Sequence, residues 1–277
     1  MERFYSIYAW PKDPYTRKGR ERFEQTVKYM EMLVVHEWVR EVISRRKVKV
    51  LEICGGTGIG GIALAKALMD RDVDVDLLVT DLRRKALEVA RKWGKEVLGR
   101  DIRVEVVDAR EVHKLDEEFD IILMYGLSTP HFDPWDFIKV IASICEVLRE
   151  NGIFIIDESD RRYSIFITQG YKWSLAEAYT EENEVKRIVV SYHIGYDPVR
   201  GVCRSAFIDY TNPGNIMVMD MFFWSIAEIS SLLWLFFEDV DAVNIKPNYY
   251  FILGYKPRRK LKIEHLSTPP RLLTKRR

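Results

Sequence analysis

Short apolar runs alternate with segments of helical spacing along the first 160 residues of the chain. Each run has the length and composition of a buried strand, and most are followed by a segment whose apolar side chains recur every three or four residues. Strands that alternate with helices in this way form parallel sheets covered by helices. We therefore predict an α/β core. The runs lie at 48–53, 76–82, 102–109, 119–126 and 151–157, and the helical segments at 62–68, 84–93 and 135–148.

After residue 160 the strand signals follow one another with only turn residues between them. Residues 187–196 alternate between apolar and polar side chains, and a turn follows at 197–201. A second run at 202–210 leads through the turn at 212–215 to a third run at 216–224. Such a pattern is typical of an antiparallel meander. We therefore predict three antiparallel strands inserted into the α/β fold.

The last part of the chain returns to helix and strand signals. Ser225 begins a helical segment that ends at Phe237, and Glu228, three residues after Ser225, has the spacing of a capping box. Two apolar runs follow at 240–245 and 249–255. These runs predict the last two strands of a seven-stranded sheet, with the final strand antiparallel.

A long segment precedes the first predicted strand. Residues 1–15 are rich in aromatic side chains and contain two prolines, so we expect an irregular conformation there. Residues 19–44 carry apolar side chains at helical spacing. This pattern predicts a long amphipathic helix before the sheet begins.

The loop after the first strand carries the strongest functional signal. Residues 54–61 read Cys-Gly-Gly-Thr-Gly-Ile-Gly-Gly. Glycine permits positive φ and lets a ligand approach bare backbone, while the first N–H groups of the next helix stay free. Parallel sheets bind nucleotide-like cofactors at such loops. The segment also fits the dinucleotide fingerprint G-x-G-x-x-G, and a purely structural turn is a further alternative, but the acidic Glu52 inside the strand argues against a dinucleotide.

Glu52 followed by Gly56 and Gly58 resembles the acidic-x-G-x-G-x-G signature of class I S-adenosylmethionine (SAM)-dependent methyltransferases. Cys54 stands where that family usually has its first glycine. Two further carboxylates, Asp81 and Asp108, end the next two predicted strands. One such acid alone is more often a helix cap than a ligand, but three at consecutive strand ends favour a cofactor site.

The resemblance implies a role for each of these positions. A carboxylate at Asp81 can accept hydrogen bonds from both ribose hydroxyls of SAM. Asp108 would bind the adenine amino group, and the backbone N–H that follows it would bind a ring nitrogen. The expected cofactor-binding residues are Glu52, Cys54, Gly55, Gly56, Gly58, Asp81, Leu82, Asp108, Ala109 and Tyr125.

The same resemblance implies an overall organisation, that of the small-molecule methyltransferases. We expect a seven-stranded Rossmann-like sheet, an N-terminal helical lid, and an inserted three-stranded antiparallel sheet on the substrate side. Similar insertions form the substrate roof in glycine N-methyltransferase-like and sugar-amine N-methyltransferases. The expected parts are the lid and helix (1–45), the SAM-binding core (46–159), the substrate-side insertion (160–223), the last helix and final core strands (224–256) and a basic tail (257–277).

Methyl transfer from a sulfonium is an in-line displacement, so alignment and the exclusion of water supply most of the acceleration. A general base is needed only if the acceptor must lose a proton. His131, after the fourth strand, is the candidate base, although an imidazole that only positions its loop is the favoured alternative. Aromatic rings can close a pocket for a small acceptor, although most rings simply pack in a core. The rings assigned to that pocket are Tyr8, Trp10, Tyr15 and Trp173.

Composition agrees with a cytoplasmic enzyme, and the charge distribution adds a basic segment at residues 256–277. The 277 residues carry a net charge of +1, the three cysteines and five histidines have no metal-ligand spacing, and no apolar run is long enough to span a membrane. Glutamine is scarce, which indicates a thermophilic source. Residues 256–277 hold nine Lys or Arg and one Glu, a local balance of +8. That tail could attract nucleic acid, or it could be a solvated extension.

Three functions therefore stay open, and the first is favoured. The favoured hypothesis is that the chain is a SAM-dependent methyltransferase that acts on a nitrogen, oxygen or carbon atom of a small molecule. Alternatively it methylates RNA or protein, guided by the basic tail, or it is a catalytically silent SAM-fold subunit of another enzyme. The residues after the fourth strand, Met124 to Leu127, lack the (Asp/Asn)-Pro-Pro-(Tyr/Phe) motif, which disfavours exocyclic nucleobase amines as acceptors. The sequence leaves oligomerisation open.

Overall fold

The structure is a computed structural model that describes residues 2–7, 12–181 and 184–274. Its centre is a seven-stranded sheet with the order β10-β11-β5-β4-β1-β2-β3. All neighbouring pairs are parallel except β10 with β11 and β11 with β5, which are antiparallel. The strands are β1 (Lys47–Ile53), β2 (Asp74–Thr80), β3 (Arg103–Glu105), β4 (Phe119–Met124), β5 (Leu148–Ser159), β10 (Phe237–Lys246) and β11 (Tyr249–Pro257).

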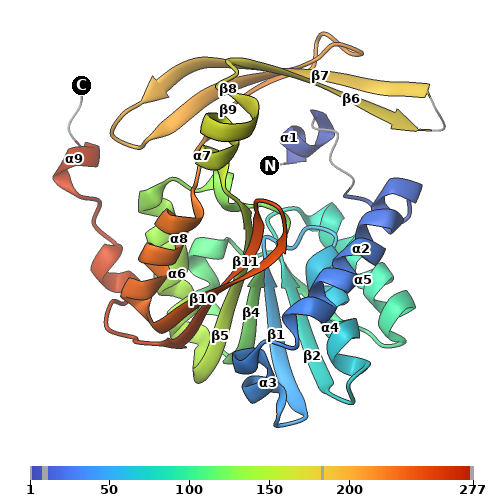
Figure 1. The fold of residues 1–277 in the computed structure, drawn as a ribbon, viewed down its shortest axis with the longest axis vertical. Coiled ribbons are helices and arrows are strands. Elements are labelled where there is room, and N and C mark those ends of the chain that lie inside the picture. Colours follow the sequence, from blue (N-terminus) through green and yellow to red (C-terminus); the bar gives the residue numbers. More distant parts are fainter. Residues whose placement is uncertain (1, 8–11, 182–183, 275–277) are drawn as a thin grey trace.

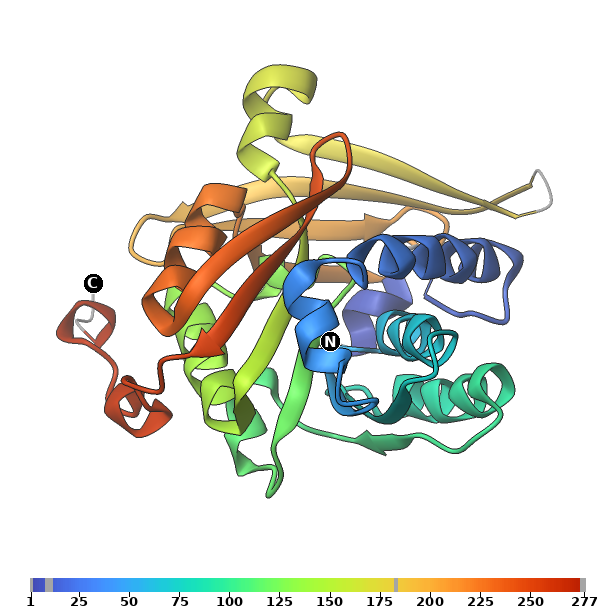
Figure 2. The same cartoon turned by 60° about the horizontal axis from the view of Figure 1, so that its bottom comes forward.

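Helices cover both faces of this sheet (Figure 1 and Figure 2). One core cluster joins the sheet to α2, α3, α4 and α5, and a second joins the opposite face to η1, α6 and α8. In β1, Val48 and Val50 belong to the first cluster, and Leu51 and Ile53 to the second. The helices are α2 (Arg17–Leu33), α3 (Glu37–Ile43), α4 (Ile59–Met69), α5 (Arg84–Leu98), η1 (Ala109–Lys114), η2 (Thr129–His131), α6 (Pro134–Val147) and α8 (Ile226–Phe236).

A second sheet lies across the carboxyl ends of the parallel strands (Figure 1). It is antiparallel, with the order β6-β7-β8-β9. The short helices α7 (Arg161–Tyr163) and η3 (Ser164–Gln169) lead into it from β5. Its strands are β6 (Ser174–Glu181), β7 (Glu184–Asp197), β8 (Val202–Asp209) and β9 (Ile216–Met221).

The inserted sheet therefore has four strands where the sequence predicts three. The additional strand is β6, whose sequence SLAEAYTE holds few β-branched or aromatic residues. It pairs along its whole length with β7, from Ser174 opposite Tyr192 to Glu181 opposite Glu184. Pairing with a neighbouring strand, which local patterning does not report, stabilises β6.

The N-terminal segment also differs from its prediction. Residues 2–7 form a short helix, α1 (Glu2–Ile7), where we expected irregular structure. Phe4 and Ile7 of α1 pack against Val189 and Phe207 under the inserted sheet. The predicted single helix at 19–44 is two helices, α2 and α3, and the side chain of His36 accepts a hydrogen bond from the backbone N–H of Trp38 at the start of α3.

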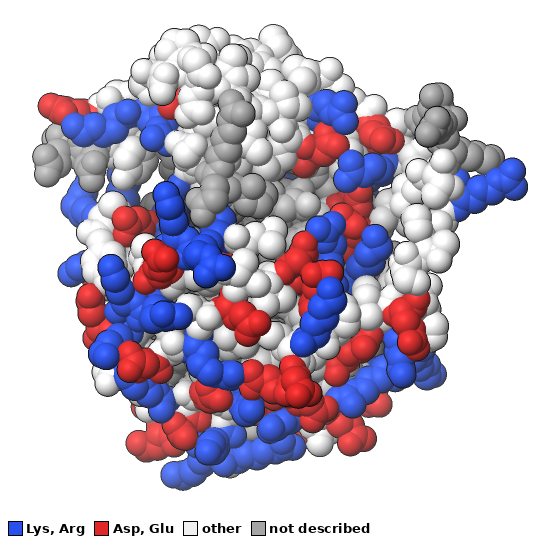
Figure 3. Space-filling model, turned by 180° about the vertical axis from the view of Figure 1, so that it is seen from behind, with Lys and Arg blue, Asp and Glu red and all other residues white. Residues whose placement is uncertain are grey.

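The chain ends beside α6 and α8. Helix η4 (Ile263–Leu266) packs against the second core cluster, and α9 (Arg271–Thr274) follows it. Acidic and basic side chains are intermingled over the parallel core, whereas the part of the surface above it carries few charges (Figure 3). Within the described ranges, every helix is too short or too polar to cross a lipid bilayer.

Candidate active site

The glycine loop turns sharply between β1 and α4. Gly56 and Gly58 have φ of +57° and +75°, the left-handed region that favours glycine. The N–H of Gly58 donates to the carbonyl of Gly55 (2.8 Å), and the N–H of Gly55 donates to Thr80 of β2 (2.9 Å). Gly58 is the N-terminal cap of α4. The loop therefore presents bare backbone at the carboxyl end of the sheet.

Glu52 lies behind this loop with 1% of its surface exposed. Burial raises the pKa of its carboxyl group to about 8, although the backbone N–H groups of Gly61 and Gly60 and the Arg22 guanidinium favour the ionised form. Neither carboxylate oxygen makes a hydrogen bond of normal geometry with the described residues. A buried acid with unused acceptors is unusual, and here it borders the small cavity described below.

Asp81 follows β2 and is held by an arginine two residues later. Its Oδ1 atom accepts hydrogen bonds from the backbone N–H (2.8 Å) and the Nε atom (2.9 Å) of Arg83. Its Oδ2 atom accepts from the backbone N–H of Gly56 (2.8 Å) and from Nη2 of Arg83 (3.2 Å). These four bonds fill the acceptor positions of the carboxylate. A ribose could therefore reach Asp81 only in exchange for Arg83.

Asp108 repeats this arrangement three residues after the end of β3, which is shorter than the predicted run at 102–109. It accepts hydrogen bonds from the backbone N–H (2.9 Å), Nε (3.1 Å) and Nη2 (2.7 Å) of Arg110. The Arg110 guanidinium lowers the pKa of Asp108, against the opposing effect of burial. Asp108 also caps η1, the role that is most frequent for a lone acid at a strand end.

Two cavities at this edge of the sheet are lined by most of the expected cofactor-binding residues. A cavity of about 200 Å³ is bordered by both acids, both arginines and the residues after them, and one of about 30 Å³ lies against the glycine loop. The larger is lined by Cys54, Asp81, Leu82, Asp108 and Ala109, and the smaller by Glu52, Cys54, Gly55, Gly56 and Tyr125. Gly58 lines neither of the two cavities.

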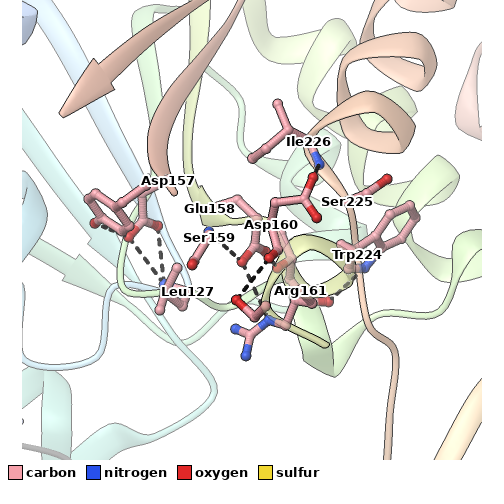
Figure 4. Close-up of polar contacts among 12 residues, drawn as sticks. Leu127, Asp157, Glu158, Ser159, Asp160, Arg161, Trp224, Ser225 and Ile226 are labelled. Carbon is pink, nitrogen blue, oxygen red and sulfur yellow. Dashed lines mark hydrogen bonds and ion pairs between the residues drawn. The ribbon is translucent and has the colours of Figure 1, made fainter. Parts of the chain in front are cut away.

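Tyr125 ends β4 next to the small cavity. Its hydroxyl is 2.9 Å from the Thr26 hydroxyl of α2, and burial raises its pKa to about 12. Just beyond it, the buried Asp157 of β5 accepts hydrogen bonds from the backbone N–H groups of Gly126 (2.9 Å) and Leu127 (3.1 Å) (Figure 4). This network fixes the end of β4, where Gly126 lines both the 30 Å³ cavity and a third, larger one.

The third cavity, of about 390 Å³, lies between the parallel strands and the inserted sheet. Its floor includes Leu127 and Arg161, and its roof includes Phe207 of β8. This volume is within the range of sites that hold small molecules. Tyr5 and His131 line both this cavity and the 200 Å³ cavity, so they form the wall between the two.

Tyr5 and His131 contact each other in that wall. The Tyr5 hydroxyl lies 3.4 Å from Nε2 of His131, and the Tyr5 ring is stacked 3.9 Å from the Arg83 guanidinium. Burial, together with the nearby Arg83 and Arg161 guanidinium groups, lowers the pKa of His131 from 6.5 to about 4. His131 is therefore neutral at physiological pH, and its buried Nδ1 atom makes no hydrogen bond with the part of the chain that the structure describes.

The residues expected in the substrate pocket are placed differently. Tyr8 and Trp10 lie outside the described residues. Tyr15 is 44% exposed, its hydroxyl donates to Glu96 (2.7 Å), and it lines none of the three cavities. Trp173 is 62% exposed and also lies outside them. Both rings instead pack at the surface, Tyr15 edge-on against Trp93 (centroids 5.5 Å apart) and Trp173 beside Tyr192 (5.8 Å).

Sequence reasoning missed several residues that line these cavities. Arg83 and Arg110 each follow an acid by two positions, so the repeated Asp-x-Arg pattern was the available signal. Tyr5, Arg22 and Arg161 carry no local signal, because they reach the site only through the packing of α1, α2 and α7.

Comparison with known proteins agrees with this geometry. Residues 50–152 match the family described as a methyltransferase domain. A ubiquinone/menaquinone biosynthesis C-methyltransferase from Rickettsia peacockii is 25% identical over 139 residues, which is 50% of this chain and 54% of that protein. Residues 50–152 are therefore similar in sequence to methyltransferase domains. The chain spans about half the length of the curated relatives it matches.

Solved structures of this methyltransferase fold extend over more of the chain. The PH0226 protein of Pyrococcus horikoshii aligns with a TM-score of 0.59 at 18% identity, covering 93% of this chain and 100% of that one. The sugar N-methyltransferase KedS8 of a Streptoalloteichus species aligns with a TM-score of 0.53 at 16% identity, covering 85% and 88%. At these identities the likeness concerns the fold alone.

We expect Asp81→Asn to weaken SAM binding about tenfold, because a neutral amide accepts weaker hydrogen bonds from ribose than a carboxylate does. Asp74→Asn is a matched control, since Asp74 begins the same strand and is exposed. Calorimetric titration of both variants with SAM tests the assignment. Equal affinities in the two variants would remove Asp81 from the cofactor site.

Cys54 has a φ of +53°, a conformation that disfavours residues with a Cβ atom. We expect Cys54→Gly to be about 1 kcal/mol more stable than Cys54→Ala, because both lose the thiol and only glycine relieves the backbone. Urea denaturation of the two variants measures this difference. A more stable alanine variant would show that the turn is unstrained at this position.

The pKa of His131 generates a pH prediction. As pH falls from 6.5 to 4, imidazole in the unfolded chain is protonated before His131 in the folded protein. The folded state therefore loses stability over this window, by on the order of 3 kcal/mol from this residue. We expect the wild type to lose more stability than His131→Asn between these pH values in urea titrations. Parallel curves for the two proteins would contradict the low pKa.

Proposed function

We propose that the protein transfers the methyl group of SAM by in-line displacement to a nitrogen, oxygen or carbon atom of a small molecule held under the inserted sheet. The observation that carries this proposal is the shared wall of Tyr5 and His131. On one side of the wall lies the cavity bordered by Asp81 and Asp108, and on the other lies a cavity of about 390 Å³ under the inserted sheet. Donor and acceptor would meet there.

The residues of the cofactor cavities fit SAM chemically. The carboxylates of Asp81 and Asp108 are suited to the ribose hydroxyls and the adenine amino group, as hydrogen-bond acceptors. Beside the small cavity, Arg22 offers a guanidinium to the carboxylate of a methionine moiety, and the ammonium group of that moiety would favour the ionised form of Glu52. SAM supplies an electrophilic methyl group on a sulfonium centre.

The protein's contribution is alignment more than proton transfer. Accepting a proton would place a positive charge on the buried His131 close to Arg83 and Arg161, and both guanidinium groups oppose that charge. His131 is therefore suited to orient Tyr5 and an acceptor as a neutral imidazole. Phe4 packs edge-on against the His131 ring, with the ring centroids 5.6 Å apart, and helps keep water out.

The acceptor cavity also favours a small molecule over RNA or protein. The inserted sheet and α1 cover the carboxyl ends of the strands, where a polymer would need an open groove. In the basic tail, Arg258 donates to the carbonyl of Phe237 (2.8 Å), and Arg259 donates to the carbonyl of Leu148 (2.6 Å). These contacts hold the start of the tail against the protein itself.

The proposal is tested in two steps with the full chain. SAM and its demethylated product should each raise the melting temperature, whereas NAD should not. Methyl-labelled SAM is then incubated with the protein and a cell extract, and the label is measured in the small-molecule, RNA and protein fractions. We expect label in the small-molecule fraction and its loss with Asp81→Asn. Label confined to a polymer fraction, or SAM binding without transfer, would overturn the proposal.

A further inference from the structure

Arg161 is held rigidly at the floor of the large cavity. Its backbone N–H donates to the carbonyl of Trp224 (3.0 Å). Asp160, the preceding residue, accepts hydrogen bonds from the backbone N–H groups of Tyr163 (2.7 Å) and Ile226 (3.1 Å), which ties α7 to the start of α8 (Figure 4). The position of Arg161 is therefore fixed by the fold before any ligand enters.

The positive charge of the Arg161 guanidinium is only weakly balanced by acidic side chains of the described residues. Its only ion pair among the described residues joins Nε to Oε1 of Glu158 at 3.5 Å, and Nε makes no hydrogen bond although it is buried. Glu158 itself is engaged elsewhere, because it accepts hydrogen bonds from the Thr129 hydroxyl and from the backbone N–H of Ser159 (2.8 Å). In Figure 4 the terminal nitrogens of Arg161 point away from Glu158 and Asp160.

The rest of the cavity lining is largely apolar. Phe4, Phe207 and Phe223 contribute rings, and Lys172 adds a second cation that has no ion pair among the described residues. Glu177 is the acidic residue of the lining. His131, which faces the same space, is neutral near pH 7. The cavity thus combines an apolar wall with a positive floor.

We propose that Arg161 binds an anionic group, a carboxylate or a phosphate, on the methyl acceptor. The flat guanidinium fork matches either group through two parallel hydrogen bonds, which are strong where water is excluded. The aromatic or apolar body of the acceptor lies against the rings and places the reacting atom at the wall of Tyr5 and His131. The acceptor is therefore a small acid, and Arg161 is its positioning residue. This inference rests on the proposed function.

The test uses the full chain saturated with S-adenosylhomocysteine, so that no turnover occurs. Benzoate, phenyl phosphate and the neutral benzamide are each titrated by calorimetry into the wild type, Arg161→Gln and Arg162→Gln. Arg162 is the matched control, because it adjoins Arg161 but is exposed and pairs with Glu228 outside the cavity. The two anions distinguish a carboxylate site from a phosphate site.

We expect at least one anion to bind the wild type at least tenfold more tightly than benzamide does. That preference should disappear in Arg161→Gln and persist in Arg162→Gln. Glu158→Gln should bind the anion at least as tightly as the wild type, because it removes the competing carboxylate. If Arg161 had only a structural role, Arg161→Gln would not lose the anion while Glu158→Gln keeps it.

Several results would overturn the inference. These are no binding of either anion to the wild type, equal binding of anion and amide, or equal loss in Arg161→Gln and Arg162→Gln. S-adenosylhomocysteine is titrated first into every variant, and unchanged affinity shows that Arg161→Gln is folded. Failure of that titration in the wild type would instead count against the proposed function, and the anions are then titrated into the unliganded protein.

Discussion

The buried carboxyl group of Glu52 determines how closely α4 approaches the sheet. A Cβ atom on Gly60 would lie 2.5 Å from one Glu52 oxygen, and one on Gly61 would lie 2.7 Å from the other. Gly55 is similarly close, at 2.8 Å. Only glycine fits at these positions, so the acid and the glycines form one packing unit. Because of this unit, the first turn of α4, with its free N–H groups, lies at the edge where the cofactor cavities open.

Around this unit, the aspartates that line the 200 Å³ cavity are paired with arginines of the protein, without a ligand. Asp81 and Asp108 each pair with an arginine two residues later, so their acceptor positions are occupied in the structure. The N-terminal segment adds to this balance, because Tyr5 stacks on Arg83 and the Thr57 hydroxyl donates to the carbonyl of Lys12. Under the proposed function, SAM binding would be an exchange of partners, in which the ribose replaces Arg83 at Asp81. Without its arginine, either buried carboxylate would lose hydrogen-bond partners, which is unfavourable away from water.

The α/β core was predictable from sequence because its signals are local. Apolar runs, the glycine loop and the acids at strand ends each report on a few consecutive residues, and the strands of the large sheet overlap the predicted runs. The run at 102–109 forms only the short β3 (Arg103–Glu105), because Asp108 caps η1 instead of ending the strand. The strand β6 and the break between α2 and α3 were not predictable in this way. Pairing with β7 stabilises β6, and a cap at His36 starts α3, so tertiary and capping interactions override the residue pattern.

The same contrast applies to the site. Nine of the ten expected cofactor-binding residues line two neighbouring cavities, because adjacent parallel strands end at the same edge. The acceptor side depends on which rings the inserted sheet and α1 turn inward. Tyr5 and Phe207 line the cavity, whereas Tyr15 and Trp173 line none of the three cavities. Composition shows that aromatic rings are present, but only the packing of these segments decides which of them line the pocket.

The central claim is that a SAM-type ligand joins the two cavities at the wall of Tyr5 and His131. A crystal structure of the protein with S-adenosylhomocysteine tests it most directly. The account predicts the ribose at Asp81 in place of Arg83, the adenine beside Asp108, and the sulfur directed toward the large cavity. A ligand bound elsewhere, or an Asp81–Arg83 pair that stays intact beside bound S-adenosylhomocysteine, would contradict it.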